Sequence, residues 1–263
     1  QFWGIPSKLN SFVLGIIAWN GVVMSWSNPN LLMMLIPAGV SVLGGLLAMW
    51  WQPNRYQRSL IQHFTAGVVL AVLAVEVLPE IGREKVDPSV LITAFALGSF
   101  FMYALRVWTE NLEAKAHTNP TMADSGLIMA TFIDVAIDGL IIGAGFAASG
   151  ETGFILALGL SFEMLFLGLA LTSDHIKGWR IVWLTLGLGL TILLFAVLGY
   201  SLLGDASSTE ISAALAFSAA ALLYLVTDEL LIEAHEVEET PESSLVLFAG
   251  FLAFWAIQLY GSH

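Results

Sequence analysis

The chain of 263 residues contains no cysteine, and charged residues make up only 11% of it. The lack of cysteine excludes a disulfide framework, a thiolate metal site and a cysteine nucleophile. Soluble domains contain roughly 25% charged residues, so the scarcity of charge excludes an ordinary cytosolic enzyme and a disordered tail. Only nine residues are Lys or Arg against 21 Asp or Glu, which gives a formal charge of −12. Such an acidic chain lacks the electrostatic footprint of a nucleic-acid-binding protein.

Apolar residues are abundant instead, at 57% of the chain with a mean hydropathy of +0.82. One water-soluble core cannot bury this much apolar side chain, so much of the protein surface must contact lipid instead of water. A membrane-spanning helix needs about 20 mostly apolar residues. We therefore expect an all-α, polytopic transmembrane helix bundle that forms a single domain over residues 1–263. Its nine predicted spans are 11–26, 31–51, 60–79, 88–108, 125–149, 153–174, 179–203, 210–235 and 243–261.

Basic residues are divided unevenly between the two sides of a membrane that these nine spans would cross. Only Arg83 and Lys85 fall on one side, and seven basic residues fall on the other. Because Lys and Arg are enriched in cytoplasmic loops, we predict that the amino terminus is inside and the carboxyl terminus outside. The seven residues are Lys8, Arg55, Arg58, Arg106, Lys115, Lys177 and Arg180.

Three acidic residues lie near the centres of predicted spans. Asp134 and Asp138 are four residues apart in the fifth span and so share one helical face, and Glu163 lies in the sixth span. An ionised carboxylate at the bilayer centre costs from about 2.5 kcal/mol to much more. All nine Lys and Arg lie in loops or at span ends, so these acids need either protons or an external cation.

A short connection joins the fifth and sixth spans, which predicts that they are antiparallel neighbours. We therefore expect Asp134, Asp138 and Glu163 to form a three-carboxylate cage around a metal ion. The other explanation is that protonated carboxyl groups form hydrogen bonds between helices and serve only packing. Glu76, toward the end of the third span, either joins the site or faces water. Further candidates at span ends, on a transport route or simply interfacial, are Glu80, Asp174, Glu229, Glu233, His63 and His175.

The order and spacing of these motifs resemble the ZIP family of divalent metal transporters over most of the chain after the first span. The run Glu-Val-Leu-Pro-Glu at 76–80 resembles the second core helix of that family, where His-x-x-Pro-Glu is common. Asp-Val-Ala-Ile-Asp-Gly at 134–139 resembles the fourth-helix signature His-Asn-x-Pro-Glu-Gly. Glu163 begins a run that resembles the fifth-helix His-Glu-x-Pro-x-Gly element, and residues 228–235 resemble the Glu-Leu-x-Pro-Glu-Ala-His of the seventh helix.

The resemblance implies a ZIP-like core at 31–261, with the segment 11–26 as an extra amino-terminal helix, in a homodimer of the cell (inner) membrane. The family often builds two metal sites, but Met164 and Leu167 stand where two of its acidic ligands would fall. The resemblance therefore implies one site. Oxygen ligands suit Mg²⁺, Ca²⁺ or Mn²⁺ better than the imidazole-containing sites that zinc prefers. The cargo is thus a divalent cation, with zinc, manganese, iron, magnesium and calcium all open.

We expect a transporter and not an enzyme. The cation would pass from the outer side to the midplane site and then to the inner side, while one helix bundle rocks against another. It would enter past Glu76 and Glu80 and leave past Asp174, Glu229 and Glu233. The alternatives are a non-transporting metal sensor or scaffold, a proton pathway without metal, and an intramembrane aspartyl protease. Such a protease takes its two aspartates from different helices, one within Gly-x-Gly-Asp, and that motif is absent here.

Overall fold

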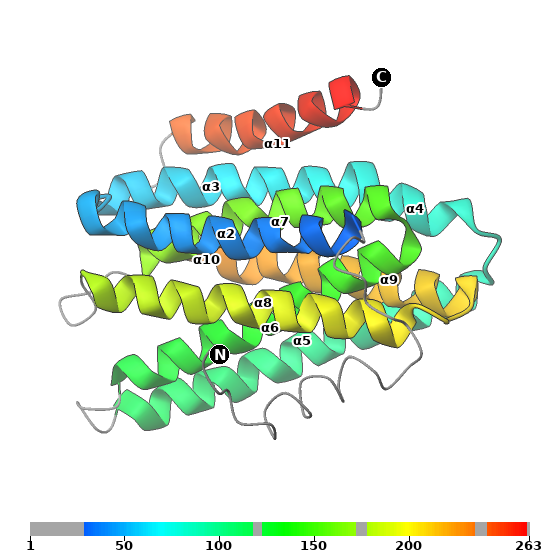
Figure 1. The fold of residues 1–263 in the computed structure, drawn as a ribbon, viewed down its shortest axis with the longest axis horizontal. Helices are drawn as coiled ribbons and strands as arrows, with labels where there is room; N and C mark the ends of the chain where they lie inside the picture. The colour runs from blue at the N-terminus through cyan, green and yellow to red at the C-terminus, as the bar shows by residue number, and fades with distance from the viewer. Residues whose placement is uncertain (1–28, 118–122, 172–177, 235–240, 262–263) are drawn as a thin grey trace, which may run out of the picture.

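The computed structural model describes residues 29–117, 123–171, 178–234 and 241–261, and in these residues it contains helices and no strand. Eight helices in this part of the chain are long and apolar enough to cross a membrane (Figure 1). A helix satisfies its backbone hydrogen bonds internally, as a lipid environment requires. The protein is therefore an all-α, multi-pass membrane protein, as its composition predicts. The predicted first span, 11–26, lies outside the described residues.

Each of the other eight predicted spans corresponds to one helix or to consecutive helical elements of the structure. The single helices are α2 (Pro29–Trp50), α5 (Pro88–His117), α6 (Ala123–Ala148), α7 (Gly150–Ala170), α8 (Trp179–Leu203) and α11 (Pro241–Gly261). The third predicted span comprises α3 (Arg55–Val72), η1 (Leu73–Val77) and α4 (Leu78–Arg83), and the eighth comprises α9 (Ser208–Tyr224), η2 (Leu225–Leu230) and α10 (Leu231–Ala234).

The third span begins at Arg55, five residues before its predicted start at residue 60. Asn54 caps this helix: its side-chain oxygen accepts a hydrogen bond from the Gln57 N–H at 2.8 Å, and the Gln57 Oε1 accepts one from the Asn54 N–H at 3.0 Å. Such a capping box satisfies backbone donors that the first helical turn leaves without partners. The polar residues at 55–58 therefore extend the apolar span instead of forming a loop.

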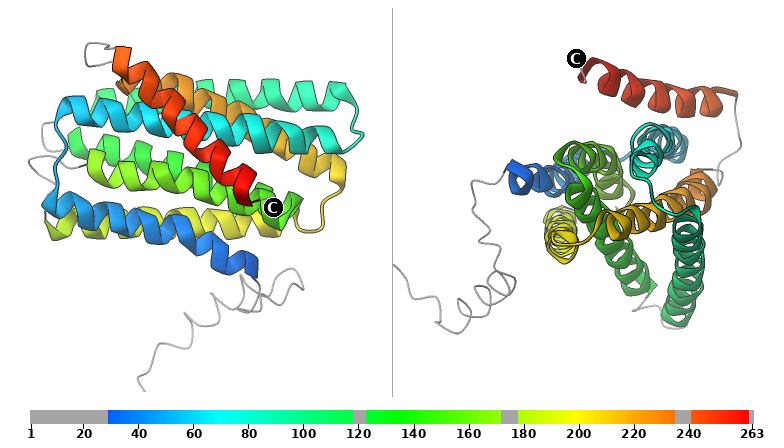
Figure 2. Two further views of the ribbon diagram at one scale, coloured as in Figure 1. Left: turned by 90° about the horizontal axis from the view of Figure 1, so that it is seen from above. Right: turned by 90° about the vertical axis from the view of Figure 1, so that its right-hand side faces the viewer.

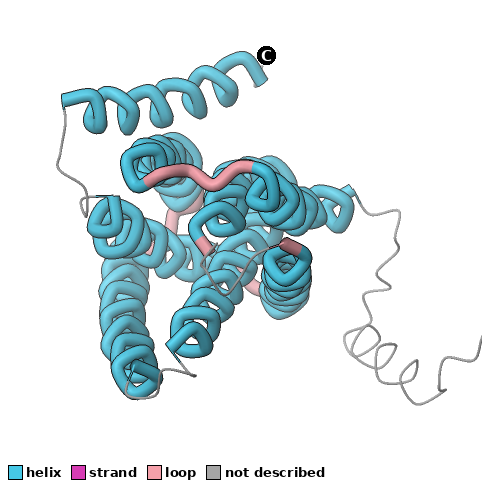
Figure 3. Tube along the Cα trace, turned by 90° about the vertical axis from the view of Figure 1, so that its left-hand side faces the viewer, coloured by secondary structure: helices cyan, strands magenta, loops and turns pink. Residues whose placement is uncertain are grey.

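The helices fall into two groups by their contacts, and Figure 3 views the whole bundle from one end. The four-helix group consists of α2, α6, α7 and α8, which pack closely together, whereas the flanking group consists of α3 with α10 and α11 and of α5 with α9. Glycine allows the close approach within the four-helix group. A Cβ on Gly139 of α6 would lie 2.6 Å from the carbonyl oxygen of Ile192 on α8, and one on Gly44 of α2 would lie 2.6 Å from that of Leu165 on α7.

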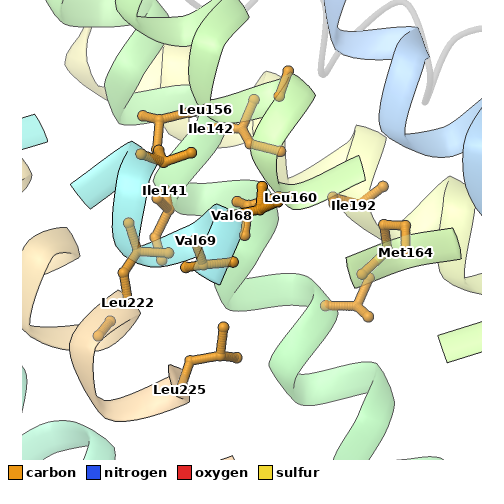
Figure 4. Packing of buried hydrophobic residues seen from close by; sticks show 14 of the residues in the cluster. Val68, Val69, Ile141, Ile142, Leu156, Leu160, Met164, Ile192, Leu222 and Leu225 are labelled. Atoms are coloured by element: carbon orange, nitrogen blue, oxygen red, sulfur yellow. The ribbon is translucent and has the colours of Figure 1, made fainter. Parts of the chain in front are cut away.

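Large apolar side chains fill the space where the two groups meet (Figure 4). Val69 from α3 and Leu222 from α9 belong to the flanking group, and Ile141 from α6 and Leu160 from α7 belong to the four-helix group; all four are at most 3% exposed. They belong to one continuous buried cluster. The core of the protein therefore includes the interface between the groups.

The outer faces of the helices carry exposed apolar side chains, such as Phe100 on α5, Trp183 on α8 and Leu245 on α11, each more than 60% exposed. Helix α11 crosses α3 obliquely on the outside of the bundle (Figure 2). An exposed apolar surface of this extent would be a liability in water but is the expected contact with lipid tails.

Two of the spans contain a π turn, in which the backbone hydrogen bonds run from residue i to i+5. One is η1, which includes Glu76, and the other is η2, which includes Asp228. Single π turns inside α-helices occur frequently at functional sites. Both interruptions lie in the flanking group, and each places an acidic residue where its helix departs from regular geometry.

Candidate metal pocket

Asp134 and Asp138 line a small pocket between the two helix groups. Both belong to α6, where their four-residue spacing puts them on one face, as the sequence predicts. The opposite walls come from α5 and α9 with η2, and all the other lining side chains are apolar: Met102, Ile137, Ile141, Ala221, Leu222 and Leu225. The pocket volume of about 10 Å³ accommodates one water-sized species.

Asp138 is the more deeply buried of the two acids, with 2% of its surface exposed, whereas Asp134 is half-buried. The Oδ2 atom of Asp138 has no hydrogen-bond partner among the described residues. The two carboxyl groups also repel each other when both are ionised. A buried acceptor without a partner costs about 1–3 kcal/mol, and more when it is charged. The apolar lining side chains offer no donor, so this cost is relieved only by a proton or by a cation in the pocket.

The basic residue that follows this pocket along α5 is Arg106, one helical turn after Met102. Its Nε lies 2.8 Å from Oε1 of Glu110 and 3.7 Å from Oδ2 of Asp228. The guanidinium is thus paired with two acids, about one helical turn beyond the pocket wall. We did not single out Asp228 as a site residue from the sequence, because one helix does not reveal a charge partner on another.

Glu163 does not line this pocket, although it is buried at 4% exposure. It shares one face of α7 with Thr152 and Gly159, and that face meets the third span: Thr152 donates a hydrogen bond to Glu76, and a Cβ on Gly159 would contact Val72. Among the described residues, no three His, Asp or Glu side chains form a group that could hold a metal ion. Among the described residues the three carboxylates therefore do not form the expected cage, and Glu163 lies on the face of α7 whose Thr152 and Gly159 meet the third span. Metal binding by Asp134 and Asp138 stays a prediction.

Glu76 lies in a different polar environment, between η1, α7 and α11. It is 6% exposed, so the interpretation that it faces water is wrong. Its Oε1 accepts a hydrogen bond from Thr152 Oγ1 at 2.8 Å, and its Oε2 lies 3.4 Å from Gln258 Nε2. Sequence reasoning missed both partners.

Of the weaker candidates, those whose side chains the structure describes do not line the pocket either. His63 is buried, and its Nδ1 lies 2.8 Å from the carbonyl oxygen of Ser59 in the same helix. Glu80 forms an ion pair with Arg83 at 2.7 Å. Glu229 is half-buried on η2. Asp174, His175 and the side chain of Glu233 lie outside the described residues.

The chemistry of the pocket is the basis for assigning a function to this protein. No family model matches the chain, and no curated protein has a significantly similar sequence.

Proposed function

We propose that this protein carries a divalent metal cation across the membrane and that Asp134 and Asp138 bind the cation in the pocket between α5, α6 and α9. The observation that carries the proposal is the buried carboxylate of Asp138, which has one oxygen without a partner in a pocket with apolar walls. Two carboxylates present up to two negative charges, which one divalent cation neutralises. The small pocket volume favours an ion that has lost most of its water.

The arrangement of the helices supports alternating access. The aspartates belong to α6 of the four-helix group, while Met102 and Leu225 on the opposite wall belong to the flanking group. Glycines hold the helices of the four-helix group at close range, which favours its motion as one unit. Sliding or rocking of one group against the other would open the pocket first to one side of the membrane and then to the other.

The resemblance of the motifs to those of ZIP transporters supports the same function. By that resemblance we also propose a homodimer in the cell membrane, and by the distribution of basic residues an amino terminus on the inside. Carboxylate oxygens favour Mg²⁺, Ca²⁺ or Mn²⁺, and competition among these ions, Zn²⁺ and Fe²⁺ during transport identifies the cargo.

The test is metal uptake into proteoliposomes that contain the purified protein. We expect Asp134→Asn and Asp138→Asn each to reduce uptake at least tenfold, and the double variant to abolish it. Asp205→Asn, which changes an exposed acid outside the pocket, should transport like the wild type. Glu163→Gln should cause a smaller loss than Asp138→Asn, because Glu163 lies on the α3 face of α7. Undiminished uptake by the double variant would refute the proposal.

The same samples separate the alternative functions. Tight metal binding without uptake would indicate a metal sensor or scaffold. Flux that follows the pH gradient and ignores metal would indicate a proton pathway. Both aspartates lie on α6, so the structure does not present the two-helix arrangement of an intramembrane aspartyl protease, and a transition-state analogue of such a protease should not bind.

A further inference from the structure

Glu76 links the two helix groups at the end of the bundle that carries the turn between α6 and α7. Glu76 belongs to η1 of the flanking group, and Thr152, which donates a 2.8 Å hydrogen bond to its Oε1, belongs to α7 of the four-helix group. Gln258 of α11 approaches the other carboxylate oxygen at 3.4 Å. One buried carboxyl group on the third span therefore contacts two other spans, α7 and α11.

The hydrogen bonds continue from Glu76 to the amino terminus of α7. Ser149 caps this helix, because its Oγ accepts a hydrogen bond from the Thr152 N–H at 2.9 Å. The same Oγ donates to Thr152 Oγ1 at 2.9 Å, and Thr152 Oγ1 donates in turn to Glu76. The partial positive charge of a helix amino terminus stabilises a nearby carboxylate, and hydrogen bonds to a charged acceptor are stronger than neutral ones.

This arrangement differs from that of Asp138. The protein's own donors satisfy Glu76, whereas the described residues leave Oδ2 of Asp138 without a partner. Glu80 and Glu151 add negative charge near Glu76, and Arg83 adds positive charge. If Thr152 moved away, the buried carboxylate would lose its short hydrogen bond in a place where two other acids repel it. Separation of the two groups at this end is therefore costly.

We propose that Glu76 is a positioning residue: its hydrogen bond to Thr152 holds the four-helix group against the flanking group and closes the aspartate pocket from the α6–α7 end, without binding the cargo. The inference rests on the proposed function, because it assigns Glu76 to the motion that exposes the pocket. It also replaces the expectation that Glu76 is a metal ligand.

The natural absence of cysteine makes a direct test possible. Ala221 lines the pocket and is 1% exposed, so Ala221→Cys introduces one small reactive group there. The measured quantity is its rate of reaction with a membrane-impermeant maleimide added from each side of the membrane. Thr152→Val keeps the shape and removes the hydroxyl, whereas Thr152→Ser keeps the hydroxyl, so these two variants form a matched pair. Glu76→Ala and Glu76→Gln form a second pair, because only Gln keeps an acceptor oxygen.

We expect Thr152→Val and Glu76→Ala to increase the labelling rate at least fivefold from the α6–α7 side and to decrease it from the opposite side. Thr152→Ser and Glu76→Gln should stay within about twofold of the parent. Unchanged labelling in both Thr152→Val and Glu76→Ala would overturn the inference. An increase from both sides would overturn it as well, because it would show general loosening of the fold.

Metal uptake by Glu76→Gln separates positioning from ligation. A positioning residue tolerates this change, so uptake should persist in Glu76→Gln under conditions where Asp138→Asn abolishes it. Equal loss in the two variants would make Glu76 a ligand and overturn the inference. Labelling requires no metal, so its outcome stands even if the protein transports none, and failure of the two proposals can be told apart.

Discussion

Arg106 and Asp228 connect α5 to η2 at one edge of the aspartate pocket, with 3.7 Å between Nε and Oδ2. Each residue follows a pocket wall by about one helical turn, since Met102 precedes Arg106 on α5 and Leu225 precedes Asp228 on η2. A cation that leaves the pocket toward this edge meets a guanidinium whose charge is balanced by acids. Removal of Arg106 makes the electrostatic potential here more negative, and removal of Asp228 makes it more positive.

Arg106→Gln and Asp228→Asn should therefore change the KM for metal uptake in opposite directions. Without Arg106 the neighbouring acids attract the cation more strongly, and KM should fall several-fold at low ionic strength. Without Asp228 the guanidinium repels it, and KM should rise. Both effects should shrink at high salt, because salt screens charges at the surface of the membrane span. Arg55→Gln, which changes an exposed residue on another helix, serves as the control, and equal shifts in all three variants would contradict the prediction.

Asp138→Asn should raise thermal stability in the absence of metal while it abolishes stabilisation by metal. The variant removes a buried carboxylate that has one oxygen without a partner, and we expect a gain of about 1 kcal/mol. Saturating metal should stabilise the wild type by about 2.7 kcal/mol at a concentration of 100 times Kd, and the variant much less. Thermal unfolding in detergent with and without metal measures both effects. A metal-free variant less stable than the wild type would count against the prediction.

Gly139→Ala should destabilise the four-helix group. The added Cβ would lie 2.6 Å from the carbonyl oxygen of Ile192, so α6 and α8 would have to separate, at a cost of about 1–3 kcal/mol. Gly39→Ala is the matched control, because it also lies inside a membrane-spanning helix but has nothing within 4 Å of the added Cβ. That variant should be neutral or slightly more stable, since alanine favours a helix over glycine. Thermal unfolding of the two variants compares them directly, and equal melting temperatures would be inconsistent with the close contact.

Asp87 lies outside the membrane-spanning segments and makes the stability of the folded protein depend on pH. Hydrogen bonds from the Ser89 side chain and from the Ser89 N–H hold the pKa of Asp87 below its usual value of 3.8. Because the folded pKa is depressed, the stabilisation is present above the unfolded pKa and is lost as pH falls through the folded pKa. Asp87→Ala should therefore be less stable than the wild type at pH 7, and the difference should shrink as the pH falls through the folded pKa of Asp87.

Asp87→Asn is the control for this experiment, because it keeps an acceptor oxygen and does not titrate. Its difference from Asp87→Ala should not change with pH, and melting temperatures across the same pH range measure it. A difference between Asp87→Ala and the wild type that stays equally large while the pH falls through the folded pKa of Asp87 would show that its charge does not contribute.

The apolar spans could be predicted from sequence because the thickness of the bilayer sets the number of apolar residues in each span. The seventh predicted span matches α8, which begins at Trp179 and ends at Leu203, the predicted boundaries. The shared face of Asp134 and Asp138 also follows from sequence, since a spacing of four residues is a local property of any α-helix. The start of α3 at Arg55 was missed because an uninterrupted apolar run was required, whereas the capping box at Asn54 extends the helix into polar residues.

The environment of each acid depends on how its helix is rotated, and local patterns carry little information about that rotation. Glu163 is buried near the middle of its helix, but the face that it occupies turns toward α3, away from the pocket. Glu76 was an undecided candidate because its partners, Thr152 and Gln258, are 76 and 182 residues away in the sequence. The sequence therefore indicated which acids are unusual, while their partners depend on tertiary packing.

The two π turns have a consequence for the evolution of this chain by insertion and deletion. A π turn accommodates one residue more than the α-helical turn it replaces, so loss of a single residue within Leu73–Val77 or Leu225–Leu230 leaves an unbroken α-helix. The rest of the helix would keep its orientation about the axis, because the deleted residue is the extra one that the π turn accommodates. Such a change would leave the apolar length of the span almost unaltered and would remove the local irregularity that contains Glu76 or Asp228. One codon at either place can thus convert an interrupted helix into a regular one while its fit to the bilayer is preserved.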